Sequence, residues 1–517
     1  MNKPYLYLMS FVTGFAVMAG QLGVGRLLAP FFGTSTPVWA FVIGTVMAGL
    51  SLGYLLGGFL AGKKQAERYL TRLPMVGGWV LLVMPWLLVA LLRGSLALFL
   101  QGAMGHLLTL ALLAAPLFFL PFLFLGAIHP LLLSCVVGED KGNVGKTGGW
   151  LYALSTWGGL LGTFVAGLLL VPLLGSRTTL LLCSLSLFVL ATFGLKGWKR
   201  RAKAAALLAG VSFLTVFVGQ QVLKENASNA HVIFQTESRY HLLKVLDDGP
   251  TRRLVFDEGF ATQSLQLADG SLPLYDVWGY YALAPALTHN GIPSDVLILG
   301  LGAGTSATLY AQLYPSSRVV GVEIDAAVVE VGRRFFALPD KTQVVVEDAR
   351  TFVRRDKGLY DVILLDAFHF PYVPFQLATR EFFHEVAQRL RPGGALLLNV
   401  GRNGADKEVV HAVAHTLGQV FPQVLGVDVP NPSNTILVAM RHSPQRMAGM
   451  ASLGLPMKAQ RALERLAMPE PWQVPPGTRV LTDEVAPVEW LTDKIFLRHV
   501  LGAFQRNPSG EGRPRYE

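Results

Sequence analysis

The chain changes character near residue 225, and this change restricts its fold more than any other feature. Up to that point it holds seven apolar stretches, each at least about as long as the roughly 20 residues that a helix needs to cross a bilayer. They span about 5–25, 38–61, 74–92, 107–137, 150–173, 177–195 and 204–223. Beyond it, short apolar segments alternate with amphipathic ones. We therefore predict a multi-pass α-helical membrane domain, 1–225, followed by an α/β part.

Composition supports a membrane location. Only 15% of the 517 residues are charged and the mean hydropathy is +0.43, which is too apolar for a soluble enzyme of this length. The net charge of +10 comes largely from short basic clusters beside apolar stretches, such as 199–203. Such clusters set topology or contact anionic lipid, so the bilayer is an expected partner and nucleic acid is not. We expect a multi-pass protein of a bacterial inner membrane.

Topology stays open at this stage. Basic residues at 63–72 and 196–203 favour a cytoplasmic N-terminus. Seven spans would then put the second half of the chain outside the cell, whereas an eighth span between 94 and 138 would return it to the cytoplasm.

Small and polar residues inside the apolar stretches suggest how the helices pack. Gly49, Gly53 and Gly57 recur every four residues, which predicts close contact with a neighbouring helix. Cys135 and Cys183 lie in apolar surroundings and are interpreted as small core residues, not as a disulfide or a metal pair. Several polar residues allow either a pathway or internal pairing. They are Gln21, Arg26, His106 and His129.

The remaining residues divide into three predicted parts. A β-hairpin subdomain is expected at 226–292, a Rossmann-like nucleoside-binding catalytic domain at 293–445, and a helical or irregular tail at 446–517. In the second part, strands are expected at 295–300, 318–323, 342–347, 360–366 and 394–400, with helices between them. These strands are apolar throughout, as in a doubly wound sheet covered on both faces. A ligand would bind at their carboxyl ends.

The residues at those strand ends indicate a nucleoside site. Gly300, Gly302 and Gly304 follow the first strand and allow a tight turn with close backbone approach to a ligand. Glu323 ends the second strand, about 20 residues further on, where an acid can bind both ribose hydroxyls. Asp348 and Asp366 follow the third and fourth strands. The alternative interpretation is a plain tight turn together with acids that are independent surface residues or helix caps. No phosphate-binding lysine follows the turn, which excludes a P-loop.

These residues resemble the spermidine synthase (polyamine aminopropyltransferase) family, in its membrane-fused branch, over about 230–400. The segment from Leu481 to Val488, LTDEVAPV, also resembles a motif near the end of fused members. The resemblance implies a β-hairpin domain before a Rossmann-like domain of class I methyltransferase type. It implies decarboxylated S-adenosylmethionine as co-substrate, putrescine or a related small amine as acceptor, methylthioadenosine as by-product, and no metal. A homodimer is the assembly considered.

The resemblance also implies roles for individual residues. Asp366 would be the general base that deprotonates the attacking amine. The expected cofactor-binding residues are Gly300, Gly302, Gly304, Glu323 for the ribose, Asp348 and Ala349 for the adenine, Gln263 and His241. Tyr280 and His369 would lie on the substrate side.

Three positions depart from the family pattern. Ala303 replaces the aspartate that holds the aminopropyl ammonium, His369 replaces the second aspartate near the amine, and His241 replaces a glutamine. A charge-assisted hydrogen bond is worth roughly 1.5–3 kcal/mol, so the first two changes weaken the amine side most. The nucleoside pocket is therefore better supported than the amine pocket.

Three functions remain as hypotheses. The leading one is a membrane-bound aminopropyltransferase. The second is an S-adenosylmethionine-dependent methyltransferase on the same scaffold, which the loss of the aspartate at 303 favours. The third is a transporter or sensor that binds a nucleoside or polyamine without turnover. Replacing Asp366 by Asn would separate enzymes from binders.

Overall fold

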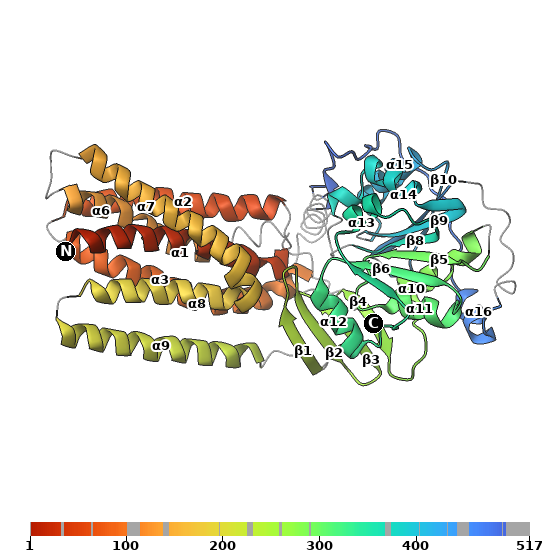
Figure 1. Cartoon of the computed structure of the whole chain (residues 1–517), viewed down its shortest axis with the longest axis horizontal. Helices are drawn as coiled ribbons and strands as arrows, with labels where there is room; N and C mark the ends of the chain where they lie inside the picture. The colour runs from red at the N-terminus through yellow and green to blue at the C-terminus, as the bar shows by residue number, and fades with distance from the viewer. Residues whose placement is uncertain are drawn as a thin grey trace, which may run out of the picture. The chain divides into compact units, whose positions relative to one another are not determined.

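The computed structural model describes residues 2–32, 36–63, 66–100, 114–137, 144–195, 197–224, 231–257, 261–288, 291–367, 374–402, 404–431, 433–441, 454–488 and 490–492. These residues form two compact units, one within 1–227 and one within 228–502. The first is helical and the second contains all the described strands (Figure 1). We describe each unit by itself.

Long apolar helices make up the first unit. They are α1 (Lys3–Phe32), α2 (Thr36–Ala61), α3 (Ala66–Leu100), α5 (Ala115–Gly126), α6 (Ile128–Val137), α7 (Val144–Val165), the π-helix η3 (Ala166–Leu170), α8 (Val171–Phe193) and α9 (Trp198–Lys224).

Five stretches of the described residues are long and apolar enough to cross a membrane. They are Lys3–Ala29, Val38–Ala61, Ala66–Leu92, Ala115–Val137 and Val144–Phe193. Seven were expected, and two features explain the difference. The expected spans 150–173 and 177–195 fall in the last stretch of 50 residues, where the backbone leaves helical geometry at Gly175, with φ at 82°. The expected span 204–223 lies in α9, whose second half has side chains outside the described residues. An eighth span would involve 101–113, which also lie outside them.

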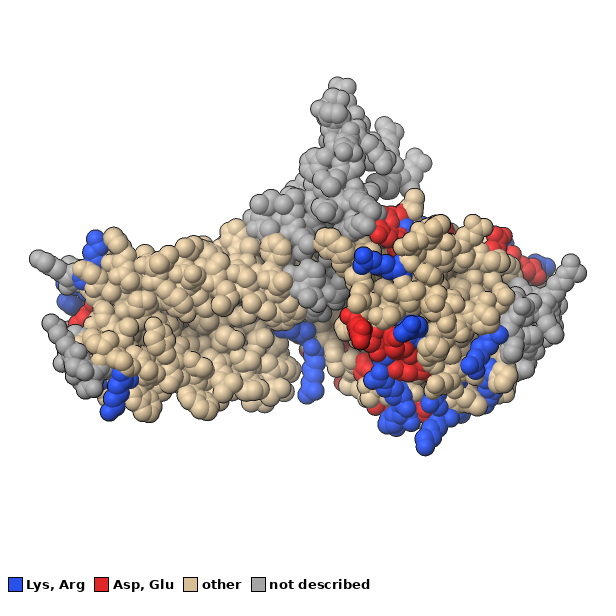
Figure 2. Space-filling model, turned by 90° about the horizontal axis from the view of Figure 1, so that it is seen from above, with Lys and Arg blue, Asp and Glu red and all other residues tan. Residues whose placement is uncertain are grey.

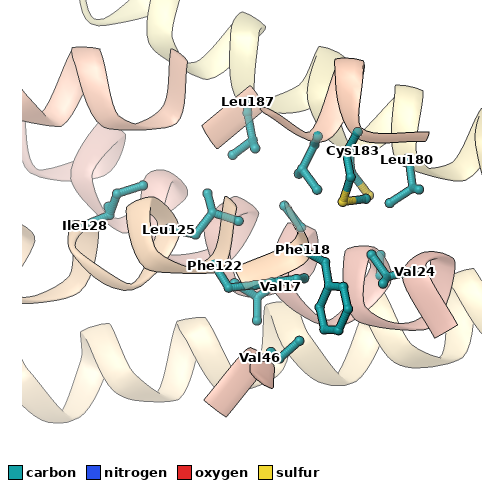
Figure 3. Packing of buried hydrophobic residues seen from close by; sticks show 14 of the residues in the cluster. Val17, Val24, Val46, Phe118, Phe122, Leu125, Ile128, Leu180, Cys183 and Leu187 are labelled. Carbon is teal, nitrogen blue, oxygen red and sulfur yellow. The ribbon is translucent and has the colours of Figure 1, made fainter. Parts of the chain in front are cut away.

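Glycines let these helices approach one another closely. A Cβ atom on Gly53 would lie 2.4 Å from the Leu123 carbonyl oxygen, and one on Gly57 would lie 2.2 Å from that of Ala127. The glycine ladder of α2 therefore faces α5 and the residue that follows it, which confirms the prediction of close helix contact. Buried side chains fill the interior of the unit, including Phe118, Phe122 and Cys183 (Figure 3). Both cysteines are free, as predicted.

The outer surface of this unit is apolar. Charged side chains are sparse along its length and gather near its ends (Figure 2). Large apolar side chains are exposed instead, among them Met47, Leu55, Phe59, Trp157 and Phe164. Contiguous exposed apolar surface of this kind is rare in soluble monomers.

The second unit begins with a four-stranded antiparallel sheet in the order β1-β2-β3-β4. Its strands are β1 (His231–Glu237), β2 (Leu242–Asp247), β3 (Thr251–Phe256) and β4 (Thr262–Leu267). These four strands lie within 226–292, where a β-hairpin subdomain was expected.

An eight-stranded mixed sheet follows, in the order β12-β10-β11-β9-β8-β5-β6-β7. The strands are β5 (Asp295–Leu299), β6 (Arg318–Glu323), β7 (Gln343–Val346), β8 (Tyr360–Leu365), β9 (Leu390–Gly401), β10 (Gln423–Asp428), β11 (Asn434–Met440) and β12 (Glu470–Pro471). Strands β5 to β9 are parallel, and the last three pair antiparallel. The doubly wound arrangement predicted for 295–400 is present, extended by an antiparallel edge.

Helices cover both faces of this sheet. One face carries α10 (Asp276–Ala282), the 3-10 helix η4 (Ala284–Leu287), α11 (Thr305–Leu313) and α16 (Met457–Leu463). The other carries α13 (Ala349–Arg355), α14 (Arg380–Ala387) and α15 (Glu408–Gly418). Helix α12 (Ala326–Phe335) packs mainly against the four-stranded sheet.

Part of the expected tail belongs to the sheet domain. Leu463 is buried in one core, and Leu481 and Val488 are buried in the other, each fully shielded from solvent. Strand β12 pairs with β10. The apolar side chains of this segment therefore complete the domain.

Candidate active site

A glycine turn forms the centre of the site. Gly300, Gly302 and Gly304 have φ values of 87°, 57° and 99°, a region that glycine adopts without steric cost. A Cβ on Gly300 would lie 2.4 Å from the carbonyl oxygen of Asp366. The turn after β5 is thus packed against the end of β8, its neighbour in the sheet (Figure 1).

Strand β4 closes over the other side of the turn. The Ser264 hydroxyl accepts a hydrogen bond from the Ala303 amide at 2.8 Å, and the Thr305 hydroxyl accepts one from the Leu265 amide at 2.8 Å. Gln263 precedes Ser264, and its carbonyl oxygen would lie 3.5 Å from a Cβ on Gly302. The structure therefore brings Gln263 to the glycine turn.

His241 has its partners within the hairpin subdomain. Its Nδ1 lies 3.2 Å from Asp257 Oδ2, and its ring stacks on Phe256 with centroids 4.5 Å apart. The Ser238 hydroxyl accepts the His241 amide and also bonds to Asp325, just after β6. These contacts connect His241 to the end of β6 through Ser238.

Glu323 ends β6 and faces the turn. Its Oε2 accepts a hydrogen bond from the Gly302 amide at 2.9 Å, and its Oε1 accepts one from the Asp325 amide at 3.2 Å. The side chain is 8% exposed. Burial raises the pKa of Glu323 to about 7, against the lowering effect of these amide bonds.

Asp348 lies next along the sheet edge, after β7. It caps α13, because its Oδ1 accepts the Thr351 amide at 2.9 Å, and it is partly exposed. Ala349 follows as a buried residue in the first turn of that helix. Four strands that are adjacent in the sheet, β8, β5, β6 and β7, thus end at or just before Asp366, Gly300, Glu323 and Asp348, respectively.

Asp366 has two polar neighbours that sequence analysis missed. Asn399 of β9 donates a hydrogen bond from Nδ2 to Asp366 Oδ1 at 3.3 Å. Tyr281 of α10 is fully buried, and the charge of Asp366 adds to the effect of burial in raising the pKa of the Tyr281 hydroxyl. Burial raises the pKa of Asp366 to about 6, despite the hydrogen bond from Asn399 and the nearby Tyr281 hydroxyl, which lower it. A carboxylate with a pKa near neutrality suits proton transfer.

Tyr280, the predicted substrate tyrosine, lies near Asp276: burial raises the pKa of its hydroxyl, and the charge of Asp276 adds to this effect. Its side chain borders a small enclosed apolar cavity with Leu397, Ile436 and Met468. Tyr281, not Tyr280, reaches Asp366. His369, the other predicted substrate residue, lies outside the described residues.

Ala303 is buried in an apolar cluster. It is fully shielded from solvent and packs with Leu243, Leu254, Val328 and Phe336, between the hairpin and α12. The side chain at this position therefore faces apolar neighbours.

Other candidate groups occupy different places. His129 of α6 lies 3.0 Å from the Ser155 hydroxyl of α7, so it is paired within the helical unit. Gln21 and Arg26 belong to α1, and His106 lies outside the described residues. In the part of the chain that the structure describes, no three His, Cys, Asp or Glu side chains form a group that could hold a metal ion.

Comparison with known proteins gives consistent matches. Residues 282–447 match the model of the spermine/spermidine synthase domain. A polyamine aminopropyltransferase of Vibrio vulnificus is 31% identical over 278 residues, which is 50% of this chain and 91% of that protein. A probable polyamine aminopropyl transferase of Bifidobacterium longum is 32% identical over 216 residues, 41% of this chain, and the match spans only about half, 47%, of the relative. Among solved structures, a probable spermidine synthase from Corynebacterium glutamicum aligns at 20% identity with a TM-score of 0.39, covering 49% of this chain and 97% of that one.

Proposed function

Because the chain belongs to the polyamine aminopropyltransferase family, we propose that it moves an aminopropyl group from decarboxylated S-adenosylmethionine to putrescine or a related small amine. The acceptor nitrogen attacks the aminopropyl carbon bound to sulfur. The C–S bond breaks as the C–N bond forms, and its electrons return to sulfur. The products are methylthioadenosine, a lengthened amine such as spermidine, and one proton.

The donor half of the site supports binding of the nucleoside. The positive φ angles at Gly300, Gly302 and Gly304 leave the backbone open to close approach by the ligand. Glu323 would accept the two ribose hydroxyls, and Asp348 would accept the adenine amino group with its remaining carboxylate oxygen. Gln263, beside the turn, would complete the pocket with Ala349.

The environment of Asp366 is the observation that carries the proposal. The acceptor amine is protonated in water and must lose a proton before it attacks. Asp366 combines a pKa of about 6, set chiefly by burial, with hydrogen-bonding contact to Asn399. A carboxylate in this state attracts the cation and can take its proton.

A second candidate is methyl transfer from S-adenosylmethionine itself. Ala303, buried among apolar side chains, favours it, because this position offers no carboxylate to the ammonium of the decarboxylated donor. Asp366 could accept the proton of an acceptor in either reaction.

We propose further that the first unit is embedded in a lipid bilayer. Its five apolar stretches and exposed apolar side chains support this location.

Product analysis tests the proposed reaction. The full chain, purified in detergent, is incubated with putrescine and with either decarboxylated or intact S-adenosylmethionine, and products are identified by mass spectrometry. Spermidine and methylthioadenosine are expected from the decarboxylated donor. S-adenosylhomocysteine from the intact donor, with no spermidine, would establish methyl transfer in its place.

A further inference from the structure

Asp276, at the start of α10, has an unusual conformation for its residue type. Its φ is 59°, in the left-handed region that few residues other than glycine adopt, although aspartate and asparagine tolerate it best. Its carboxylate accepts a hydrogen bond from the Asn431 side-chain amide. The side chain is partly exposed, so a ligand can reach it. No motif of the sequence singled this residue out.

A series of hydrogen-bonded asparagines connects Asp276 to Asp366, the proposed base. Asn431 Oδ1 accepts the backbone amide of Asn434 at 2.9 Å, and Asn434 Nδ2 donates to Asn399 Oδ1 at 2.8 Å. Asn399 in turn donates to Asp366. Each of these five residues is partly exposed. They form an accessible polar wall with a carboxylate at either end.

The guanidinium group of Arg402 holds this polar wall in place. Arg402, whose side chain is 10% exposed, donates hydrogen bonds to the carbonyl oxygens of Val429, Asn431, Asn434 and Gly404. The guanidinium thereby links the backbone after β10 to the start of β11 and holds Asn431 in place. The two carboxylates are close enough that the negative charge of Asp276 contributes to raising the pKa of Asp366.

Tyr281 independently indicates that a ligand belongs here. Its hydroxyl is fully buried beside Asp366 and makes no hydrogen bond of normal geometry to any described group. Its backbone is fixed, because the hydroxyls of Tyr310 and Tyr314 donate to the carbonyl oxygens of Tyr281 and Ala282 at 3.0 and 2.6 Å. A rigidly held, unsatisfied hydroxyl beside a carboxylate is suited to an incoming polar group.

We propose that Asp276 binds the distal ammonium of a diamine acceptor whose attacking nitrogen lies at Asp366 and Tyr281. This inference rests on the proposed function, since it assigns the second nitrogen of the same substrate. Two like charges repel each other, and a dication between them relieves that repulsion. Asp276 is thus a specificity residue for diamines over monoamines.

The test compares two acceptors that differ only in the second ammonium, 1,4-diaminobutane and 1-aminobutane. Asp276→Asn keeps the shape, tolerates the backbone angle and can still accept the bond from Asn431, so it removes charge alone. We expect KM for the diamine to rise at least about tenfold, while KM for the donor stays within about twofold. The kcat/KM for the monoamine should not change. Asp269→Asn, the same substitution in an exposed turn, should behave as the parent. Equal losses for both amines, or an unchanged diamine KM, would overturn the proposal.

Binding separates a failure of this inference from a failure of the proposed function. If the parent protein transfers no aminopropyl group, calorimetric titration of both amines in the presence of methylthioadenosine still applies. Tighter binding of the diamine by the parent, lost in Asp276→Asn, would support the diamine site in the absence of that reaction. Equal affinity of the parent for both amines would refute it.

Discussion

The proposed nucleoside half of the site should depend on the protonation state of one carboxyl group. Glu323 is buried behind the glycine turn, and burial raises its pKa to about 7. Below that pH the carboxyl group of Glu323 is mostly protonated and neutral. A neutral carboxyl group accepts hydrogen bonds from the two ribose hydroxyls more weakly than a charged carboxylate does. As the pH rises through 7, the carboxylate form increases.

Nucleoside affinity should therefore increase with pH. From pH 6 to pH 8, the ionised fraction of a group with a pKa of 7 rises about tenfold, and we expect the same increase in affinity for methylthioadenosine. The measurement is calorimetry on the Asp366→Asn protein, which removes the other carboxylate that titrates in this range. Glu323→Gln should bind weakly with no such slope. A flat profile in the presence of Glu323 would show that its ionisation does not matter for the ribose.

Neighbouring residues on one helix show where sequence alone reaches its limit. Tyr280 and Tyr281 are adjacent in α10, so their side chains diverge by about 100° around the helix axis. Tyr281 reaches Asp366, whereas Tyr280 borders an apolar cavity and interacts with the charge of Asp276. The choice depends on which face of α10 meets the sheet, and no local pattern fixes that face.

Among the elements, the start of α13 is tied to the end of the described chain. Arg350, two residues after Asp348, forms a bidentate pair with Asp483 at 2.7 and 2.8 Å and also binds Glu385 at 2.9 Å. Thr379 Oγ1 donates to Asp483 Oδ1 at 2.7 Å. The segment 481–488, which resembles the family motif, thus holds α13 in place, the helix whose start carries the proposed adenine-binding residues.

Breaking this brace should affect donor binding and stability together. Asp483→Asn removes the charge that pairs with Arg350, and because Asp483 is 40% exposed we expect a loss of only about 1 kcal/mol in unfolding free energy. KM for the donor should rise several-fold with a smaller change in kcat. Thermal unfolding and steady-state kinetics of the full chain measure both. Glu484→Gln, an exposed neighbour, is the matched control. An unaltered donor KM in a destabilised Asp483→Asn protein would assign the brace a purely structural role.

The central strands were largely predictable, and the later ones were not predicted. Strands β5 to β8 are apolar runs bounded by glycine or acidic residues, so their bounds agree with the expected ones within one residue. Strands β10 and β11 carry similar apolar runs that lie a few residues apart in the sequence, a pattern typical of a β-hairpin. The pairing of Arg350 with Asp483 joins residues far apart in the sequence, and composition and periodicity carry no trace of it.

At the scale of the whole molecule, the two units differ in how much apolar surface they expose. The helical unit exposes side chains such as Leu55, Phe59 and Leu173. The other unit buries its apolar side chains in cores on both sides of a mixed sheet. Burial of exposed apolar surface in lipid contributes roughly 25 cal/mol per Å², which makes release into water strongly unfavourable across several helices.

The chain should accordingly behave as an integral membrane protein. After cell lysis the protein is expected in the membrane pellet. It should remain there through washes in about 1 M salt and in alkaline carbonate, which strip electrostatically bound proteins. Detergent should release it. Fractionation followed by immunoblotting measures this, with a cytosolic enzyme as the control. Release by salt alone would mean that the helices do not cross the bilayer.

Asp366 is the residue on which the proposed chemistry depends most. Asp366→Asn keeps the shape and can still accept the bond from Asn399, but it cannot take a proton from the acceptor amine. We expect the single-turnover rate of aminopropyl transfer to fall by roughly 10²–10⁴, with affinity for methylthioadenosine within about twofold of the parent. Asp340→Asn, at an exposed position, should leave both unchanged. Transfer at the parent rate by Asp366→Asn would contradict the assignment of Asp366 as the general base.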